Sequence, residues 1–297
     1  MASQRDVKNR IASVKNIQKI TRAMEMVAAA RLRRAEQRIA KLRPYADAIK
    51  RMTYQAAKAA GAEVSSFPLL SEHERVERVG LLLITGDRGL AGAFNSQIIR
   101  AGVRAGVDLA DEGLKTSWYA TGRRGVSSLT FRGRELSGSY TGFTDKPAYA
   151  DARSIADDLM SGYIDGKLDR VEILYNSYVS PLTQHVTRET LLPLSGSVLE
   201  DEDEDEQQQG PQPLVEYEPD AAEILQRLVP DYVEISIYRA LIESAAGFFG
   251  AQMTAMRNAS ENAGTLIEDY TLQMNRARQA EITQEIMEVV AGAEGLA

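Results

Sequence analysis

The apolar residues of this chain recur at helical spacing in two long segments, one near each end. In the first segment the stripe consists of Ile17, Ile20, Met24, Val27, Ala28, Leu32, Ala35, Ile39, Leu42, Ala46 and Ile49. Most steps are three or four residues, which is typical of a helix that packs against one partner. We expect this helix to continue past Pro44, with a local bend there, and to end between Ala60 and Gly61.

The C-terminal segment has a stricter repeat, in which steps of four and three residues alternate. Its positions are Ile242, Ala246, Phe249, Met253, Met256, Ser260, Ala263, Ile267, Tyr270, Met274 and Ala277. About five heptads of this kind predict a coiled-coil seam, in which Ser260 is the one polar member. The last proline is Pro230, so we expect a helix from about Asp231 to Ala291, roughly 90 Å long at about 1.5 Å per residue. The first long helix is its natural partner.

The segment between the helices alternates strand and helix patterns. Strands are expected at Val79–Thr85 and Thr116–Thr121, followed by a strand pair at Arg170–Val179 and Gln184–Leu192 that is joined through Ser180 and Pro181. Helices are expected from near Asn95, within Gly122–Ser128 and over Ala148–Ile164. This alternation predicts a small, mostly parallel, doubly wound sheet. The fold class is therefore α/β plus a long helical coiled coil.

Composition divides the chain into four segments. They are the first helix (1–60), the α/β region (61–195), an acidic segment (196–218) and the second helix (219–297). Residues Glu200 to Glu206 are all acidic, and their mutual repulsion predicts a disordered surface loop. A regulatory tail that competes for the basic first helix is the alternative.

Charge is distributed unevenly along the chain. The net charge is −7, yet residues 1–60 contain 15 Lys and Arg residues against 4 Asp and Glu. This asymmetry indicates that one end meets an acidic partner, which could be nucleic acid, anionic lipid or a protein surface. The chain contains no cysteine, which excludes disulfides and thiol switches. It has neither an apolar run long enough to span a membrane nor a secretory signal, so we expect a cytoplasmic protein without direct membrane insertion.

A glycine-rich turn follows the first expected strand, at the place where α/β proteins bind phosphates. The spacing of Gly86, Gly89 and Gly92 fits neither the dinucleotide nor the P-loop pattern. We therefore expect a structural turn or a docking surface, in which Asp87 and Arg88 form a salt bridge or cap the turn. His73 and His185 are the only histidines and lack metal-ligand spacing. We expect no catalytic site, metal or cofactor.

Two charged helix segments remain as candidate interaction sites. The first is a basic track on the first helix, formed by Arg31, Arg33, Arg34, Arg38, Lys41 and Arg43. It lacks the interleaved aromatic residues of a nucleic-acid site, so an acidic protein partner and a solvated helix face are the favoured interpretations. The second is the tip from Asn275 to Gly292, which mixes both charges with amides. This mixture favours a specific socket in another protein.

Three motifs in these regions resemble the gamma subunit of rotary ATP synthases. They are the run from Arg10 to Ala30, the turn from Asp87 to Gly92, and Asn275 to Ile286 with Gly292 and Ala293 after it. The resemblance implies that an antiparallel coiled coil stands inside a hexamer of three alpha and three beta subunits, with one copy per complex. The α/β foot would contact the epsilon subunit and the c-ring, at the cytoplasmic face of the bacterial plasma membrane. Proton flow would turn this chain, and ATP would form on the beta subunits.

The resemblance also implies roles for single residues. Met24, Arg278 and Gln279 resemble contacts to the beta subunit, and Thr283, Glu285 and Glu288 fall in the same C-terminal signature. The basic track would face acidic surfaces of the head, and Asp87, Arg88, Gly89 and Gly92 would form a turn of the foot. Two departures are Gly247 and Gly250, where the family has polar residues, which puts the local stiffness of the helix in question. There are two alternatives to this function. One is a nucleotide-binding α/β protein with a helical arm, and the other is a basic coiled-coil adaptor for nucleic acid.

Overall fold

The computed structural model describes residues 4–61, 67–194 and 220–294, with side chains described up to residue 291. The acidic tract and the expected loop 196–218 therefore lie outside the described residues. The chain forms two compact units, one made of residues 1–29 and 252–297 and the other of residues 30–251. These units divide both long helices, whereas the four segments expected from the sequence follow the helix ends. That segmentation stays a prediction.

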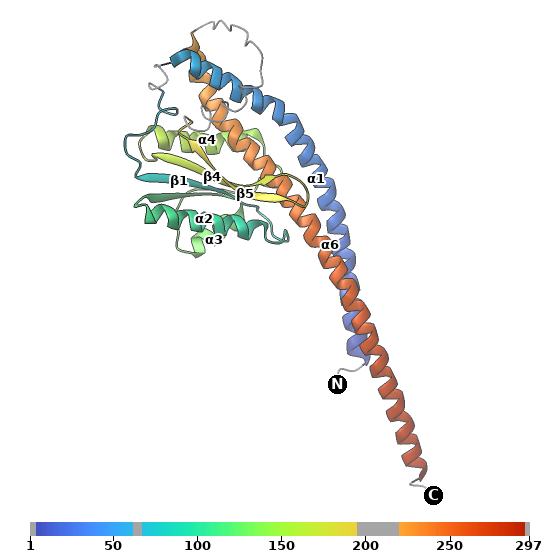
Figure 1. The fold of residues 1–297 in the computed structure, drawn as a ribbon. Coiled ribbons are helices and arrows are strands. Elements are labelled where there is room, and N and C mark those ends of the chain that lie inside the picture. Colours follow the sequence, from blue (N-terminus) through green and yellow to red (C-terminus); the bar gives the residue numbers. More distant parts are fainter. Residues whose placement is uncertain (1–3, 62–66, 195–219, 295–297) are drawn as a thin grey trace. The chain divides into compact units, whose positions relative to one another are not determined.

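The larger unit contains a five-stranded sheet in the order β3-β2-β1-β4-β5 (Figure 1). Its strands are β1 (Arg78–Ile84), β2 (Lys115–Thr121), β3 (Leu136–Tyr140), β4 (Arg170–Tyr178) and β5 (Gln184–Leu192). All neighbours are parallel except β4 and β5, so the prediction of a mostly parallel sheet is confirmed. Strand β3 was not predicted, because its sequence LSGSY contains no β-branched residue.

Helices cover both faces of this sheet, as expected of a doubly wound fold (Figure 1). Helices α2 (Phe94–Asp111) and α3 (Arg123–Phe131) lie on one face, and α4 (Tyr149–Ile164) lies on the other. Helix α2 packs closely because a Cβ atom at Gly102 would lie only 2.4 Å from Leu83, and one at Gly106 only 2.5 Å from Trp118. The fully buried side chains of β1 form the centre of both cores.

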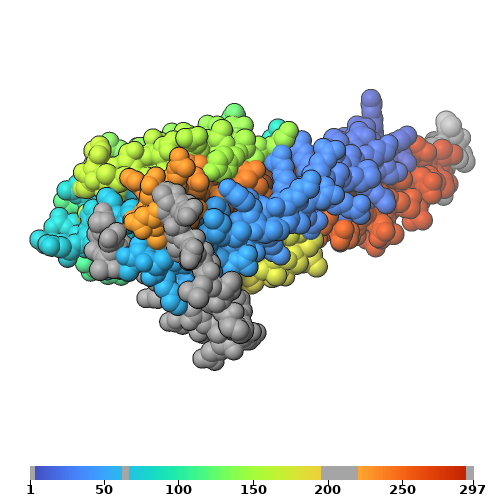
Figure 2. All heavy atoms as spheres, turned by 90° about the horizontal axis from the view of Figure 1, so that it is seen from above, coloured from blue at the N-terminus to red at the C-terminus, as the bar shows by residue number. Residues whose placement is uncertain are grey.

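The two long helices are α1 (Gln4–Ala60) and α6 (Ala221–Glu294). The predicted end of α1 is confirmed, but the predicted start of α6 at Asp231 is wrong. The helix begins ten residues earlier and includes Pro230, because Leu225 and Val229 are buried in the core with α4 and the end of α1. Burial of these side chains outweighs the loss of one helical hydrogen bond at the proline. Figure 2 shows this part of α6, in orange, between α4 in green and α1 in blue.

The glycines at 247 and 250 let the β4–β5 hairpin approach α6. A Cβ atom at Gly250 would lie 3.0 Å from the carbonyl oxygen of Pro181, and one at Gly247 would lie 3.2 Å from the ring of Phe94. Both positions belong to the larger unit, where neighbouring backbone and side chains surround the helix. The glycines therefore serve close packing in this unit.

In the smaller unit, the seam predicted for α6 is confirmed. Met256 and Ala263 are buried, and the other seam positions from Met253 to Ala277 are partly buried. Every described residue from Arg278 to Ala291 is exposed. The pairing of Glu25 with Arg257, and of Gln18 and Thr21 with Ser260, shows that the two helices run antiparallel.

In this unit the predicted stripe of α1 is confirmed only in part, because Met24 is half-buried and Ala28 is buried, whereas the other three positions are exposed. Ile17, Ile20 and Val27 are 53%, 59% and 54% exposed. The seam of α1 is formed by Val7, Ile11, Val14, Gln18, Thr21 and Ala28. They are three or four residues apart, except for the seven residues from Thr21 to Ala28. The hydroxyls of Thr21 and Ser260 lie 2.7 Å apart, and the Gln18 amide donates to the Ser260 carbonyl at 3.3 Å. These bonds satisfy the polar seam positions, so they can be buried. Across the described parts of the chain, no helix is long and apolar enough to cross a membrane.

Candidate functional site

The tip of α6 presents its predicted polar residues to solvent. Arg278 and Gln279 are exposed on the helix directly after the last seam position. The Thr283 hydroxyl donates to the Gln279 carbonyl at 2.8 Å, so it is satisfied within its own helix. The Gln284 amide donates to Glu288 at 3.0 Å. Glu285 is exposed as well, so the five charged and amide side chains remain accessible from outside.

The tip also exposes apolar residues that the sequence interpretation did not include. They are Ile282, Ile286, Met287, Val289 and Val290, whose residues are between 48% and 72% exposed. Ile282, Ile286 and Val289 are spaced by four and three residues, so they share one face of the helix. That spacing was a signal available in the sequence. An apolar face without a partner among the described residues is typical of a helix that packs inside another protein.

Met24 lies in the smaller unit, which is the coiled-coil unit, beside a second set of exposed apolar residues. Its side chain is half-buried, and its neighbour Glu25 accepts an ion pair from Arg257 at 2.9 Å. Ile17, Ile20 and Val27 point away from the seam. This pairing leaves α1 with two apolar stripes, one toward α6 and one toward solvent. The outward stripe can pack against a surrounding protein.

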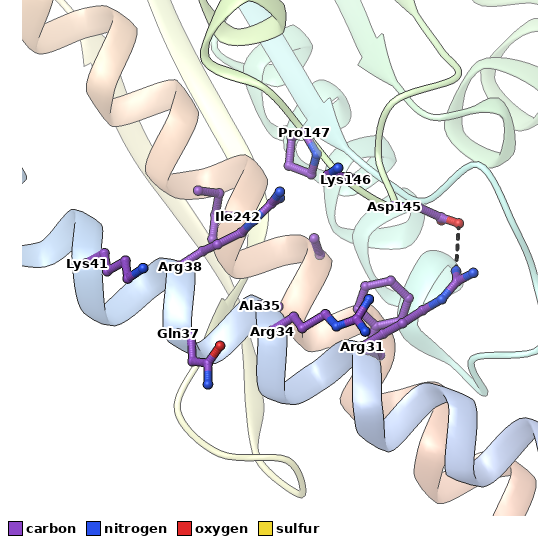
Figure 3. Close-up of a pocket in the computed structure, with 12 residues that line it drawn as sticks. Arg31, Arg34, Ala35, Gln37, Arg38, Lys41, Asp145, Lys146, Pro147 and Ile242 are labelled. Carbon is purple, nitrogen blue, oxygen red and sulfur yellow. Dashed lines mark hydrogen bonds and ion pairs between the residues drawn. The ribbon is translucent and has the colours of Figure 1, made fainter.

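The structure divides the basic track of α1 into two groups. Arg31, Arg34, Arg38 and Lys41 line a cavity of about 530 Å³ in the larger unit, whereas Arg33 and Arg43 are exposed outside it (Figure 3). Arg31 is fixed in place by Asp145 at 3.2 Å and by the ring of Phe249, whose centroid lies 5.6 Å from its guanidinium carbon. The track is thus a pocket wall along part of its length.

The turn after β1 is organised by Asp87. Its carboxylate accepts hydrogen bonds from the amides of Gly142, Thr144 and Arg123 at 3.0 to 3.2 Å, and from the Thr144 hydroxyl at 2.8 Å. Burial by itself raises the pKa of the Asp87 carboxyl. The hydrogen bonds from Gly142, Thr144 and Arg123 outweigh burial, so the pKa lies below its ordinary value of 3.8.

Arg88 pairs with Asp145 at 3.2 Å, and the turn is closed by its own side chains. Asn95 accepts from the amide of Gly86 at 2.8 Å and donates to the carbonyl of Arg88 at 3.0 Å. The amide of Asp87 donates to the Thr144 hydroxyl at 2.8 Å. Backbone amides of such a turn are the donors that a phosphate would need, and those of Gly86 and Asp87 are engaged. Their engagement argues against a nucleotide site in this turn.

Gly89 and Gly92 have different roles within the turn. Gly92 has a φ of +56°, a conformation that favours glycine. Gly89 lies against Arg124, whose guanidinium would be 2.9 Å from an added Cβ atom. The backbone conformation therefore favours glycine at position 92, whereas at position 89 an added side chain would have to displace the exposed Arg124 side chain.

Within residues 4–61, 67–194 and 220–294, no three His, Asp or Glu side chains lie close enough to hold a metal ion. His73 contacts Asp169 at 3.2 Å, and its ring is tilted by 53° against the ring of Tyr163, with the centroids 4.5 Å apart. These contacts hold the His73 ring against the folded α/β core, in the segment that precedes β1.

Comparison with known proteins gives matches over the whole chain. A family model described as ATP synthase matches residues 3–296. An ATP synthase gamma chain from Rubrobacter xylanophilus is 43% identical over 297 residues, covering 100% of this chain and 99% of the relative. One from Streptomyces avermitilis is 44% identical, covering 100% and 97%. One from a Nostoc species is 41% identical and covers both chains completely.

Solved structures give the same fold at low sequence identity. A chain of the Euglena gracilis mitochondrial ATP synthase matches with a TM-score of 0.67 and 15% identity, covering 99% of this chain and 94% of its own. A chain from the central stalk and c-ring of the Tetrahymena thermophila enzyme matches with a TM-score of 0.61 and 23% identity, covering 81% and 99%. At these identities the likeness establishes the fold.

Proposed function

Because this chain belongs to the family of ATP synthase gamma chains, we propose that it is the rotating central shaft of a proton-translocating F-type ATP synthase. Proton flow turns a c-ring, the ring turns this chain, and the chain drives the beta subunits through the states in which ATP forms. As a gamma chain it is a non-catalytic subunit. The observation that carries the proposal is the tip of α6, which continues beyond the end of the seam with every described side chain exposed.

The coiled-coil unit is the part that we place inside the head of three alpha and three beta subunits. A helix end with exposed apolar and polar groups needs a protein socket that satisfies both. We assign Arg278, Gln279, Thr283, Glu285 and Glu288 to contacts with beta subunits at this tip. Met24 and the outward stripe of α1 supply further contact along the shaft. We propose one copy of this chain per complex, because a single shaft serves the whole hexamer.

The larger unit, residues 30–251, is the α/β unit, and it is the part that we place on the c-ring and the epsilon subunit. Asp87, Arg88, Gly89 and Gly92 form a defined turn at the end of β1, and the turn is closed by hydrogen bonds rather than open to a ligand. A rigid turn of this kind suits a docking surface. The basic track supplies positive charge toward acidic surfaces of the head, through Arg33 and Arg43 in particular, which are exposed.

The complex that contains a gamma chain is associated with a membrane. We propose that this chain is peripheral, at the cytoplasmic face of a bacterial plasma membrane, and that the c-ring is its link to the membrane. It needs no nucleic acid and no cofactor of its own for this role. The engaged amides of Gly86 and Asp87 disfavour the alternative of a nucleotide-binding α/β protein at the glycine turn.

Co-expression with candidate alpha and beta subunits tests this function. We expect native mass spectrometry to find a complex with one copy of this chain for three alpha and three beta subunits. The full chain with residues 278–297 removed is the comparison, since those residues lie beyond the seam, and it should associate more weakly. Failure of the complete chain to associate with the subunits of its own genome would refute the proposed function.

A double substitution tests the contacts at the tip. Arg278→Ala with Gln279→Ala should weaken coupling of proton flow to ATP synthesis, with about tenfold weaker retention of the chain in the head. The control is Gln226→Ala with Arg227→Ala, which removes the same residue types from adjacent exposed positions on the same helix, outside the tip. Helicity should be unchanged in both variants. Equal coupling in the two variants would show that Arg278 and Gln279 are not specific contacts.

A further inference from the structure

The cavity beside the basic track carries an inference that does not depend on the proposed rotation. Three segments form its walls, namely α1, α6 and the loop Asp145–Pro147 that precedes α4. Its volume of about 530 Å³ is within the range of small-ligand sites. All of its residues belong to the larger unit, so its walls are parts of one compact body. The cavity therefore lies within one compact body and is open to solvent on one side.

Positive charge dominates the lining of this cavity. Five cations line it, and they are Arg31, Arg34, Arg38, Lys41 and Lys146. The one carboxylate, Asp145, is already held by Arg31 and Arg88, each at 3.2 Å. Within the part of the chain that the structure describes, Arg34, Arg38, Lys41 and Lys146 form no ion pair. Four cations without a counter-charge around one cavity call for an anionic ligand.

The arrangement of these cations fits a chain of phosphates. Arg34, Arg38 and Lys41 are spaced by four and three residues, so they follow one face of α1, and Lys146 lies across the cavity from them (Figure 3). A guanidinium group binds phosphate through two parallel hydrogen bonds, and an ammonium group binds it as a point charge. A single phosphate would meet only part of this row.

The floor of the cavity is apolar. Ala35, Ile242, Ala245 and Phe249 contribute to it, and all four residues are buried. Figure 3 shows Arg38 extended beside Ile242, so that its charge lies at the edge of the apolar surface. A charged rim over an apolar floor suits a ligand with both a polyphosphate and a flat or apolar group.

We propose that this cavity binds a small polyphosphate anion, either an inorganic polyphosphate or a nucleoside triphosphate. Arg34, Arg38, Lys41 and Lys146 hold the phosphates. The apolar floor receives the base when the ligand is a nucleotide. This site is separate from the glycine turn after β1, whose amides are engaged.

Isothermal titration of the full-length chain, without magnesium, tests the proposal with tripolyphosphate, ATP, AMP and hexaglutamate as probes. We expect tripolyphosphate and ATP to bind one per chain, with about micromolar affinity, and AMP to bind much more weakly. Equal binding of tripolyphosphate and ATP would assign the site to the phosphate chain alone. Tighter binding of ATP would show that the apolar floor also takes part.

A matched pair of variants locates the binding. Arg34→Gln with Arg38→Gln should weaken tripolyphosphate binding by about tenfold or more, because two direct contacts are lost. Arg33→Gln with Arg43→Gln removes the same charge from the same helix outside the cavity, and should change binding by less than about twofold. All four positions are at least partly exposed, so helicity and thermal unfolding should stay as in the parent chain.

Three results would overturn the proposal. Absence of tripolyphosphate and ATP binding to the parent chain would do so directly. Equal weakening in the two double variants would show general electrostatic attraction in place of a site. Binding of hexaglutamate that depends on Arg34 and Arg38, when tripolyphosphate does not bind, would assign the cavity to an acidic protein segment.

Discussion

Replacement of Asp87 by asparagine is the sharpest test of how the turn after β1 is held. The carboxylate accepts from three backbone amides and one hydroxyl, while its side chain is only 12% exposed. Asparagine keeps one oxygen and puts an NH₂ group where the other oxygen was. In its best orientation the oxygen still meets Thr144, and the NH₂ group faces the amide of Arg123.

The expected loss follows from this geometry. One backbone N–H loses its acceptor, which costs about 1–3 kcal/mol. The remaining bonds lose the charge that makes them roughly twice as strong as neutral ones. We therefore expect Asp87→Asn to lower the free energy of unfolding of the α/β unit by about 3 kcal/mol. Asp157→Asn, at an exposed position of α4, removes the same charge and should cost less than about 0.5 kcal/mol.

Urea unfolding followed by tryptophan fluorescence measures this loss in the right unit. Trp118 is the only tryptophan of the chain, and it is buried in the core of the α/β unit at 4% exposure. Because the pKa of Asp87 is lowered by folding, its carboxylate stabilises the fold above the unfolded pKa near 3.8. That contribution is lost as the pH falls through the folded pKa, which is lower still.

The difference between Asp87→Asn and the parent should therefore be constant from pH 7 to about pH 5, and should shrink only below about pH 4. Equal unfolding midpoints for Asp87→Asn and Asp157→Asn would refute the reasoning. A difference that disappears already near pH 6 would show that another group is responsible.

Two further variants test packing in the two units. Thr21→Val should destabilise the coiled coil by about 1 kcal/mol, because it leaves the Ser260 hydroxyl without its partner. Adding Ser260→Ala should recover most of that loss in a double-mutant cycle measured by circular dichroism, and simple additivity of the two losses would contradict the pairing. Gly122→Ala should lower the unfolding free energy of the α/β unit by at least about 3 kcal/mol, since φ is +81° and the new Cβ atom would lie 2.3 Å from the carbonyl oxygen of Thr85. Gly166 has a similar φ, but no atom lies within 4 Å of an added Cβ atom, so Gly166→Ala should lower the unfolding free energy by only about 1 kcal/mol. Equal losses of unfolding free energy at the two glycines would mean that steric contact does not matter.

The strongly periodic parts of the chain could be predicted from the sequence. The seam of α6 is regular over about five heptads, and its positions are protected in the structure as expected. The strands rich in β-branched residues were also found, whereas β3 (LSGSY) has no β-branched residue and was missed. The early start of α6 could not be predicted, since Pro230 is a local stop signal and the burial that overrides it comes from distant segments.

The register of α1 shows a second limit of sequence interpretation. Ile17, Ile20 and Val27 form an apolar stripe as regular as a seam, but α6 presents Ser260 at that level. Thr21 and Gln18 can bond to Ser260, and the isoleucines cannot. The inward face of α1 combines the apolar residues Val7, Ile11 and Val14 with this polar pairing to a residue about 240 positions away, which no local pattern reveals.

The candidate sites were only partly visible in the sequence. The basic track was evident from its composition, but the cavity beside it was not, because Lys146 and Asp145 come from a loop more than 100 residues away. Arg88 was expected beside Asp87, yet its partner is Asp145, which also pairs with Arg31. The exposed apolar positions at the tip, by contrast, were present as a spacing of three and four and could have been identified.

The most direct test of the central claim is rotation of this chain within its own alpha and beta subunits. The chain has no cysteine, so Phe131→Cys, at a position that is 92% exposed in the α/β unit, provides a single point for attaching a bead. With the head fixed to a surface and ATP supplied, we predict that the bead turns continuously in one direction and stops when ATP is removed. ATP hydrolysis by the assembled complex without any rotation of the bead would contradict the account of this chain as the shaft.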